Sequence, residues 1–333
     1  MTDARPLDAD EATFITAVRS GDPARFAHIT ERHRRELQVH CYRMLANYED
    51  AQDMTQETFL RAWRKRETFK GHAALRTWLY RIATNVCLDF LDRRTDRTPV
   101  PAGLPDSEVP HLQPYPDRML PEDPQESVVA RETIELAFIV AVQHLPPRQR
   151  AVLILRDVLG WPAPKAADTL ELTVASVTSA LQRARVTMRA QLPGRRLDWR
   201  SPATHELSDD ERGVVKSYID AHQRNDLDGL TSLLRDDLRF AMLPDPGTVT
   251  TTAGDAVDGW VSGGLFQHGH DDWRGVTTTV NRMPAAVLYL RTPDDVEHRP
   301  FAVAVLHVVD GKIAELTGFD VTGKPWLDLP PAP

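Results

Sequence analysis

Residues 50–63 read DAQDMTQETFLRAW, and the basic triplet Arg64-Lys65-Arg66 follows directly. Apolar side chains recur in this stretch with a helical spacing: Ala51, Met54, Phe59, Ala62 and Trp63. Such spacing is typical of an amphipathic helix. Acidic and amide residues occupy its polar face and give way to basic residues at its end, so the charge changes sign within a few residues.

The segments on either side are also predicted to be helical. Apolar residues keep the helical spacing over most of residues 12–95, and no part of this range alternates like a strand. Arg76 and Arg81 are interleaved with Trp78 and Tyr80. Arginine binds phosphates and aromatic rings stack on unpaired bases, so this pattern favours a single-stranded nucleic acid. The alternative is a helical core, in which we expect Trp63 and Leu79.

Residues 163–190 predict a helix–turn–helix unit. A short helix over about 163–170 is followed by a turn, and Thr173 stands where an N-cap belongs. In the second helix we expect these polar side chains to face outward: Ser176, Thr178, Ser179, Gln182, Arg183, Arg185 and Arg189. Hydroxyl and amide groups bond base edges, and arginine neutralises phosphates. The alternative is an ordinary helical hairpin with a solvated basic face.

The net charge of −8 conceals a segregation of charge along the chain. Residues 61–97 and 147–205 each carry six more basic than acidic side chains, whereas residues 98–146 and 206–333 are acidic. The balance of the whole chain argues against a nucleic acid partner. Two basic islands, residues 61–97 and 147–205, are separated by the acidic residues 98–146, and this distribution favours a nucleic acid partner.

Residues 98–125 contain eight prolines. Proline fixes φ and lacks an N–H donor, so this density predicts an extended, acidic linker between independently folded units. Within the linker, residues 109–116 (VPHLQPYP) offer apolar side chains for docking on a surface.

Composition excludes several classes of protein. No apolar run reaches the length needed to cross a bilayer, and the first residues do not resemble a secretory signal. Cys41 and Cys87 have no nearby CxxC or Cys/His partners, which rules out a disulfide framework and argues against a zinc module. We therefore expect a cytoplasmic protein without metal or cofactor and without membrane contact.

Residues 206–330 predict an α+β domain. Ser208 and Glu211 form a capping box for a first helix, and Asp226 caps a shorter one. Strand-like runs follow at 238–243, 276–283, 286–291, 301–309 and 313–319, with a short helix expected near 253–265. Asp310-Gly311 predicts a type I′ hairpin turn. Helices followed by strands of this kind indicate an antiparallel sheet beside helices.

Three motifs together resemble the sigma-70 family of bacterial RNA polymerase sigma factors, specifically its extracytoplasmic-function (ECF) group. DAQDMTQETFLRAW resembles the region-2 helix, FKGHAALRTWLYRIATNVCLDFLDRR the promoter-melting segment, and LPPRQRAVLILRDVLG with VASVTSALQRAR the region-4 helix–turn–helix. The resemblance implies two all-α domains, region 2 at residues 12–97 and region 4 at 126–195, joined by the 98–125 linker. It implies core RNA polymerase and promoter DNA as partners, with contacts to the clamp coiled coil of the large subunit and to the flap region.

The resemblance also implies roles for particular residues. Asp53, Gln56, Glu57 and Leu60 match positions that bind the clamp coiled coil. Phe69, Trp78, Arg81 and Asn85 match positions that open the −10 element. The following helix–turn–helix residues match positions that bind the −35 element: Thr173, Ser176, Thr178, Ser179, Gln182, Arg183 and Arg185. Two departures stand out, because Glu171 replaces the glycine usual in the turn, and Pro162 and Pro164 begin the first helix of the unit.

The 206–330 domain resembles the SnoaL-like, NTF2-like cone through the order of its elements and the fragment FAVAVLHVVDGKIAELTGF. In the sigma-factor subgroup with such tails, the tail is thought to modulate activity, and the chain is then no enzyme. An alternative is a DNA-binding fusion whose cone is a ligand sensor with a small ligand, or a SnoaL-type isomerase or cyclase. Candidate acid–base residues by type are Asp245, His268, Asp271, His307 and Asp320. A simple helix–turn–helix repressor is a third reading, but it explains neither the acidic helix nor the Arg/Trp segment.

Overall fold

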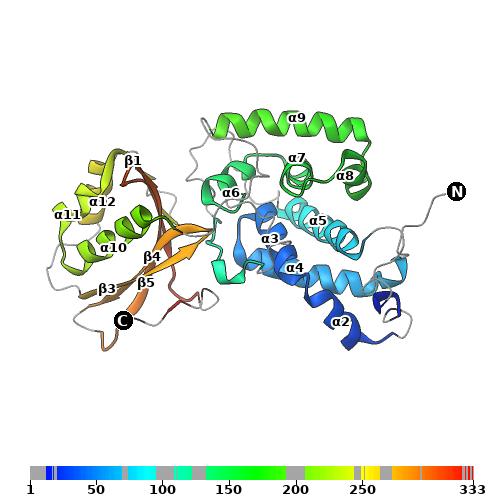
Figure 1. Ribbon diagram of the computed structural model, residues 1–333, viewed down its shortest axis with the longest axis horizontal. Coiled ribbons are helices and arrows are strands. Elements are labelled where there is room, and N and C mark those ends of the chain that lie inside the picture. The colour runs from blue at the N-terminus through cyan, green and yellow to red at the C-terminus, as the bar shows by residue number, and fades with distance from the viewer. Residues whose placement is uncertain are drawn as a thin grey trace. The chain divides into compact units, whose positions relative to one another are not determined.

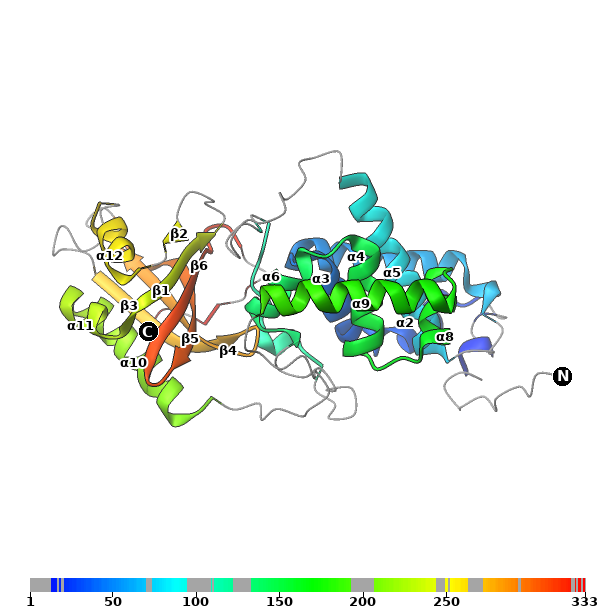
Figure 2. The same cartoon turned by 90° about the horizontal axis from the view of Figure 1, so that it is seen from above.

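The computed structural model describes residues 13–16, 18, 21–69, 74–94, 109, 111–121, 133–192, 207–243, 249–250, 252–262, 272–292, 295–324, 327, 329–330 and 332. The chain divides into two compact units (Figures 1 and 2). The helical unit comprises residues 1–103 and 119–203, and the cone unit comprises residues 104–118 and 204–333. In the described part of the chain, no helix is both long and apolar enough to span a membrane.

The first half of the helical unit contains the helices that the sequence predicts. They are α2 (Pro23–Glu31), α3 (Arg34–Leu45), α4 (Tyr48–Arg64) and α5 (Leu75–Arg94). Asp22 caps α2 by accepting hydrogen bonds from the Ala24 and Arg25 amides, and Asn47 caps α4 through the Asp50 amide. The α3, α4 and α5 helices pack on one another through their apolar faces.

The second half contains α6 (Leu136–Gln143), α7 (Pro147–Leu153), α8 (Ala163–Leu170) and α9 (Val174–Gln191). Pro147 occupies the first turn of α7, where its missing N–H costs nothing. The α7 helix continues as a π-helical turn, Ile154–Val158, and Gly160 follows with a positive φ of 68°. Figure 1 shows α9 above α7 and α8, against which it packs.

Two buried arginines join the two halves of the helical unit. Arg150 of α7 donates to the Met44 carbonyl at the end of α3, and also to the Gln143 and Leu145 carbonyls at the end of α6. Arg43 donates to the carbonyl and the hydroxyl of Thr133, at 3.1 and 2.7 Å. The sequence predicts independently folded units on the two sides of the linker. In the structure, α3 packs against α6 and α7, and the two guanidiniums bind carbonyls across this contact.

The cone unit begins with α10 (Asp209–Gln223) and α11 (Leu227–Ser232). The predicted Ser208–Glu211 capping box and the Asp226 cap are both present. The sheet strands are β1 (Leu234–Leu243), β2 (Val249–Thr250), β3 (Asp272–Val280), β4 (Met283–Arg291), β5 (Arg299–Val309) and β6 (Lys312–Asp320). Helix α12 (Ala253–Ser262) precedes β3, and α10 lies across one face of the sheet (Figure 1).

Among the described residues the sheet has six strands in the order β2-β1-β6-β5-β4-β3. The expectation of an antiparallel sheet is correct for every pair except β1 and β6, which are parallel. Tight hairpins force neighbours in sequence to be antiparallel. The long connection between β1 and β6 imposes no such direction.

Two hairpin turns have left-handed residues at both central positions. Asp310 and Gly311 have φ of 52° and 74°, as the sequence predicts. Asn281 and Arg282, at 54° and 56°, form a second such turn inside the segment predicted as one strand, 276–283. The sequence signal was weak there because arginine stands where glycine is usual.

The buried His222 makes the cone unit sensitive to acid. Its Nδ1 donates to the Tyr218 carbonyl at 2.9 Å, and burial lowers its pKa to about 4. The unfolded chain binds this proton at the ordinary pKa of about 6.5. Between about pH 4 and pH 6.5 the unfolded chain therefore holds more protons than the folded chain. We expect the free energy of unfolding to fall by roughly 2 kcal/mol as the pH drops from about 7 to about 4.5.

Urea unfolding followed by tryptophan fluorescence at a series of pH values measures this slope. His222→Phe keeps the ring and removes the titrating group, so it should flatten the slope, whereas His28→Phe at an exposed position should not. An equally steep slope in His222→Phe contradicts the assignment.

Candidate functional surfaces

An apolar groove runs between α2 and α4 in the helical unit. It has a volume of about 240 Å³ and is lined by Phe26, Phe59, Leu60, Trp63, Gln56 and neighbouring residues. Leu60 is 46 % exposed, and Asp53 and Gln56 are exposed on the same helix. The carboxylate of Glu57 is engaged by Arg61 Nε at 2.7 Å. Three of the four predicted clamp-binding residues are therefore accessible, and Glu57 has an internal partner.

The residues predicted for the −10 element divide into two sets. Phe69 and Trp78 form an aromatic cluster with Phe14, with ring centroids 5.1 to 5.9 Å apart. Phe69 is buried in that cluster and Trp78 is half-buried. Arg81 and Asn85 lie half-buried further along α5, so the structure pairs the two rings with each other and not with Arg81.

Arg81 has acidic partners from the helix–turn–helix. Its Nη1 lies 3.4 Å from Asp168 Oδ2, and its Nη2 lies 3.1 Å from Glu171 Oε1. Both carboxylates are exposed. In this conformation the guanidinium expected to meet DNA is bound to carboxylates instead.

Glu36 is a residue that the sequence analysis missed. It is buried on α3, and its carboxylate accepts from Arg76 Nε at 2.6 Å, Tyr80 OH at 3.0 Å and His33 Nδ1 at 2.6 Å. Burial by itself raises the pKa of Glu36, but the His33 and Arg76 contacts outweigh it and hold the pKa below its ordinary value. Glu36 therefore fixes the start of α5. The sequence places Glu36 at a helical spacing from His40 and Arg43, which are also buried, and this spacing could have indicated that Glu36 is buried too.

The second helix of the helix–turn–helix, α9, presents the predicted −35 residues to solvent. Thr173 caps α9 by accepting from the Ser176 amide at 3.1 Å. The following residues are exposed as predicted: Ser176, Thr178, Ser179, Gln182, Arg183 and Arg185. Arg185, however, makes a two-point contact with Asp157, at 2.8 and 2.7 Å. Arg183 makes no hydrogen bond or ion pair with the residues that the structure describes.

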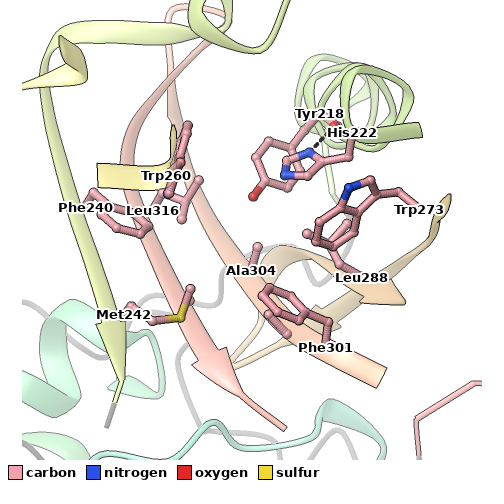
Figure 3. A pocket seen from close by; sticks show the side chains of 12 residues that line it. Tyr218, His222, Phe240, Met242, Trp260, Trp273, Leu288, Phe301, Ala304 and Leu316 are labelled. Carbon is pink, nitrogen blue, oxygen red and sulfur yellow. Dashed lines mark hydrogen bonds between the residues drawn. The ribbon is translucent and has the colours of Figure 1, made fainter. Parts of the chain in front are cut away.

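The cavity of the cone unit is small and mostly apolar. Figure 3 shows aromatic side chains around it, with Trp260 against Phe240 and Trp273 against Phe301 at centroid distances of 5.3 and 5.2 Å. Its volume is about 30 Å³, room for one or two water molecules. The described residues that line it include no carboxylate. The Trp273 Nε1 donor, which is buried, finds no acceptor among the described residues.

The two acid–base candidates that the structure describes, His307 and Asp320, do not line this cavity. Asp320 is exposed and accepts from the Thr322 amide at 2.9 Å, which makes it a turn residue. His307 is half-buried on β5, 3.9 Å from Glu315. Asp245, His268 and Asp271 lie outside the described residues.

The segment between the two halves of the helical unit contacts the β3–β4 turn of the cone unit. The Asn281 amide donates to the Tyr115 carbonyl at 2.9 Å, and the Tyr115 amide donates to Asn281 Oδ1 at 2.7 Å. Pro116 forms a bridge with Val280, and the Arg282 amide donates to Asp117 Oδ1 at 2.8 Å. The apolar side chains Val109, Leu112 and Tyr115 are buried. We call Val109 together with residues 111–118 the docked linker.

Two family models and several curated proteins match this chain. The family models for sigma-70 region 2 and sigma-70 region 4 match residues 29–97 and 135–188. The chain is 38% identical over 326 residues to the ECF RNA polymerase sigma factor SigG of Mycobacterium tuberculosis, covering 94% of this chain and 85% of that protein. It is 31% identical over 180 residues to SigW of Bacillus subtilis, covering 54% of this chain and 94% of SigW.

A comparison of structures also covers the cone unit. The crystal structure of the extracytoplasmic-function sigma factor SigJ of Mycobacterium tuberculosis matches with a TM-score of 0.58 and 23% identity, covering 88% of this chain and 96% of SigJ. Helical regions 2 and 4 followed by a sheet domain are thus a fold shared with that protein. Because the SigG match spans most of both chains at this identity, the chain belongs to the ECF RNA polymerase sigma factors.

Proposed function

We propose that this sigma factor binds core RNA polymerase through the groove between α2 and α4. The observation that carries the proposal is the exposed Leu60 at the edge of an apolar groove, with Asp53 and Gln56 beside it. A solvent-exposed leucine in a groove lined by Phe26, Phe59 and Trp63 is typical of a protein interface. The clamp coiled coil of the polymerase is the partner that the family indicates.

Promoter recognition is divided between α5 and α9 in this proposal. The exposed polar row of α9 supplies groups for base edges and phosphates of the −35 element. The α5 helix supplies Trp78, Arg81 and Asn85 for the opened −10 element, while Phe69 supports Trp78 from the core. Phosphodiester chemistry stays with the polymerase, so the chain itself carries out no reaction.

We also infer that the cone unit modulates activity by holding the docked linker. The linker connects the regions proposed to read −10 and −35. Docking fixes the span of its middle residues, so only the remaining residues can extend when these regions separate. Asn281 Oδ1 and Asp117 Oδ1 each accept one of the hydrogen bonds that hold the linker, so a single substitution can remove a docking contact.

A ligand sensor is the second candidate for the cone unit. The unpartnered Trp273 Nε1 favours it, because a ligand carbonyl could accept that hydrogen bond. The small cavity favours linker docking over this candidate, since pockets that bind organic ligands are usually about ten times larger.

Leu60→Asp should weaken binding to purified core polymerase by about tenfold or more, because a charge would enter an apolar contact. Fluorescence titration with core polymerase measures the affinity, and run-off transcription measures the consequence. Val296→Asp, at a position that is 90 % exposed in the cone unit, is the matched control and should bind like the parent chain. Equal affinity of both variants would remove the groove from the interface.

Arg183 and Arg185 should differ in what their loss does. Arg183→Ala should lower affinity for promoter DNA and reduce the slope of log K against log salt by about one, since one phosphate contact disappears. Arg185→Ala should instead lower the free energy of unfolding by about 1–2 kcal/mol, because Asp157 loses both of its hydrogen bonds. Binding and urea unfolding of both variants check this, and a reversed pattern contradicts it.

Asn281→Gly should release the docked linker. Glycine keeps the positive φ of the turn and removes the Oδ1 acceptor, whereas Asn281→Asp keeps an acceptor there. We expect amide hydrogen exchange in residues 111–118 to become about three- to tenfold faster in Asn281→Gly and run-off transcription to rise, with Asn281→Asp close to the parent chain. Exchange that stays at the parent rate in Asn281→Gly would show that Asn281 does not hold the linker.

A further inference from the structure

The contact between Arg81 and the helix–turn–helix joins two surfaces that are both expected to bind DNA. Asp168 lies near the end of α8, and Glu171 lies in the turn before α9. Their carboxylates reach the two terminal nitrogens of Arg81 on α5, at 3.4 and 3.1 Å. Two oxygens from separate carboxylates thus occupy the donors that would otherwise face phosphate oxygens.

Glu171 adopts a backbone conformation that glutamate disfavours. Its φ and ψ are 55° and 43°, in the left-handed region where glycine pays no steric penalty. A residue held in such a conformation points to a role for its side chain. Among the described residues, the carboxylate of Glu171 reaches Arg81.

The ion pairs sit beside a packed contact between α5 and the helix–turn–helix. The ring of Tyr80, adjacent to Arg81 in sequence, meets the ring of Trp161 at a centroid distance of 5.6 Å, and both rings are buried. Lys165 of α8 covers the other part of Trp161 at 3.9 Å. This packed contact holds α8 and its following turn beside α5, while the carboxylates of Asp168 and Glu171 themselves stay exposed.

We propose that Asp168 and Glu171 act as internal phosphate mimics that mask Arg81 from DNA in the free chain. This inference rests on the proposed −10 role of Arg81. Exposed ion pairs are individually weak, so a DNA backbone with many phosphates displaces them readily, whereas a single stray phosphate does not. The masking thus reduces unproductive binding by free sigma factor while leaving promoter engagement open.

The test is a mutant cycle on the full-length chain with a labelled single-stranded oligonucleotide of mixed sequence. The double variant Asp168→Asn with Glu171→Gln keeps side-chain shape and removes both charges. We expect it to bind the oligonucleotide about fivefold more tightly than the parent chain. The same double change in an Arg81→Ala background should give no such gain, because no guanidinium is left to unmask.

Two controls separate masking from general charge and from folding. Asp89→Asn removes an exposed carboxylate of α5, the helix that carries Arg81. Asp89 pairs with Arg61 of α4, so this change should give a much smaller gain than the double variant. Glu171→Gly removes the carboxylate and suits the left-handed turn, so it should fold at least as well as the parent chain and bind more tightly. An equal gain with and without Arg81, or no gain, would overturn the masking.

The cycle also distinguishes this inference from the proposed function. If Arg81→Ala lowers affinity in the unmasked background while unmasking itself gives nothing, the masking is wrong and the promoter role of Arg81 stands. If Arg81→Ala has no effect in that background, Arg81 does not meet nucleic acid and both fail together.

Discussion

The buried guanidinium of Arg150 is the interaction on which the helical unit depends. A helix leaves its last carbonyls without partners and carries a partial negative charge at that end. Arg150 donates to carbonyls at the ends of both α3 and α6, so one cation satisfies two helix ends. Burial lowers the pKa of Arg150 to about 9, which leaves it charged at neutral pH. Loss of this side chain would leave buried carbonyls unpaired in both helices.

Once α3 is fixed in this way, it positions α5. At the other end of α3, Glu36 binds Arg76 and Tyr80 in the first part of α5. The buried carboxylate is stabilised by those donors and by His33. Arg81 follows Tyr80 directly, so the contacts of Glu36 also position the residue expected at the −10 element.

Charge segregation then assigns different roles to similar residues. The basic islands of the sequence contain arginines that bind internal acids, such as Arg185 with Asp157. They also contain arginines such as Arg183, which has no acidic partner among the described residues. An arginine on an exposed helix face is available to DNA only if no carboxylate of the chain reaches it. This distinction depends on which helices pack together, and it separates residues that a motif treats alike.

The sequence by itself determined the helices, the capping residues Thr173, Ser208 and Asp226, the Asp310-Gly311 turn and the family, because these depend on local spacing and on nearby backbone groups. It also identified the exposed face of α9. Tertiary structure alone decided the parallel pairing of β1 with β6, the partners of Arg81 and Arg150, and the docking of Tyr115 on Asn281. Those contacts join residues far apart in the chain, and no local pattern encodes which distant carboxylate or carbonyl a side chain will meet.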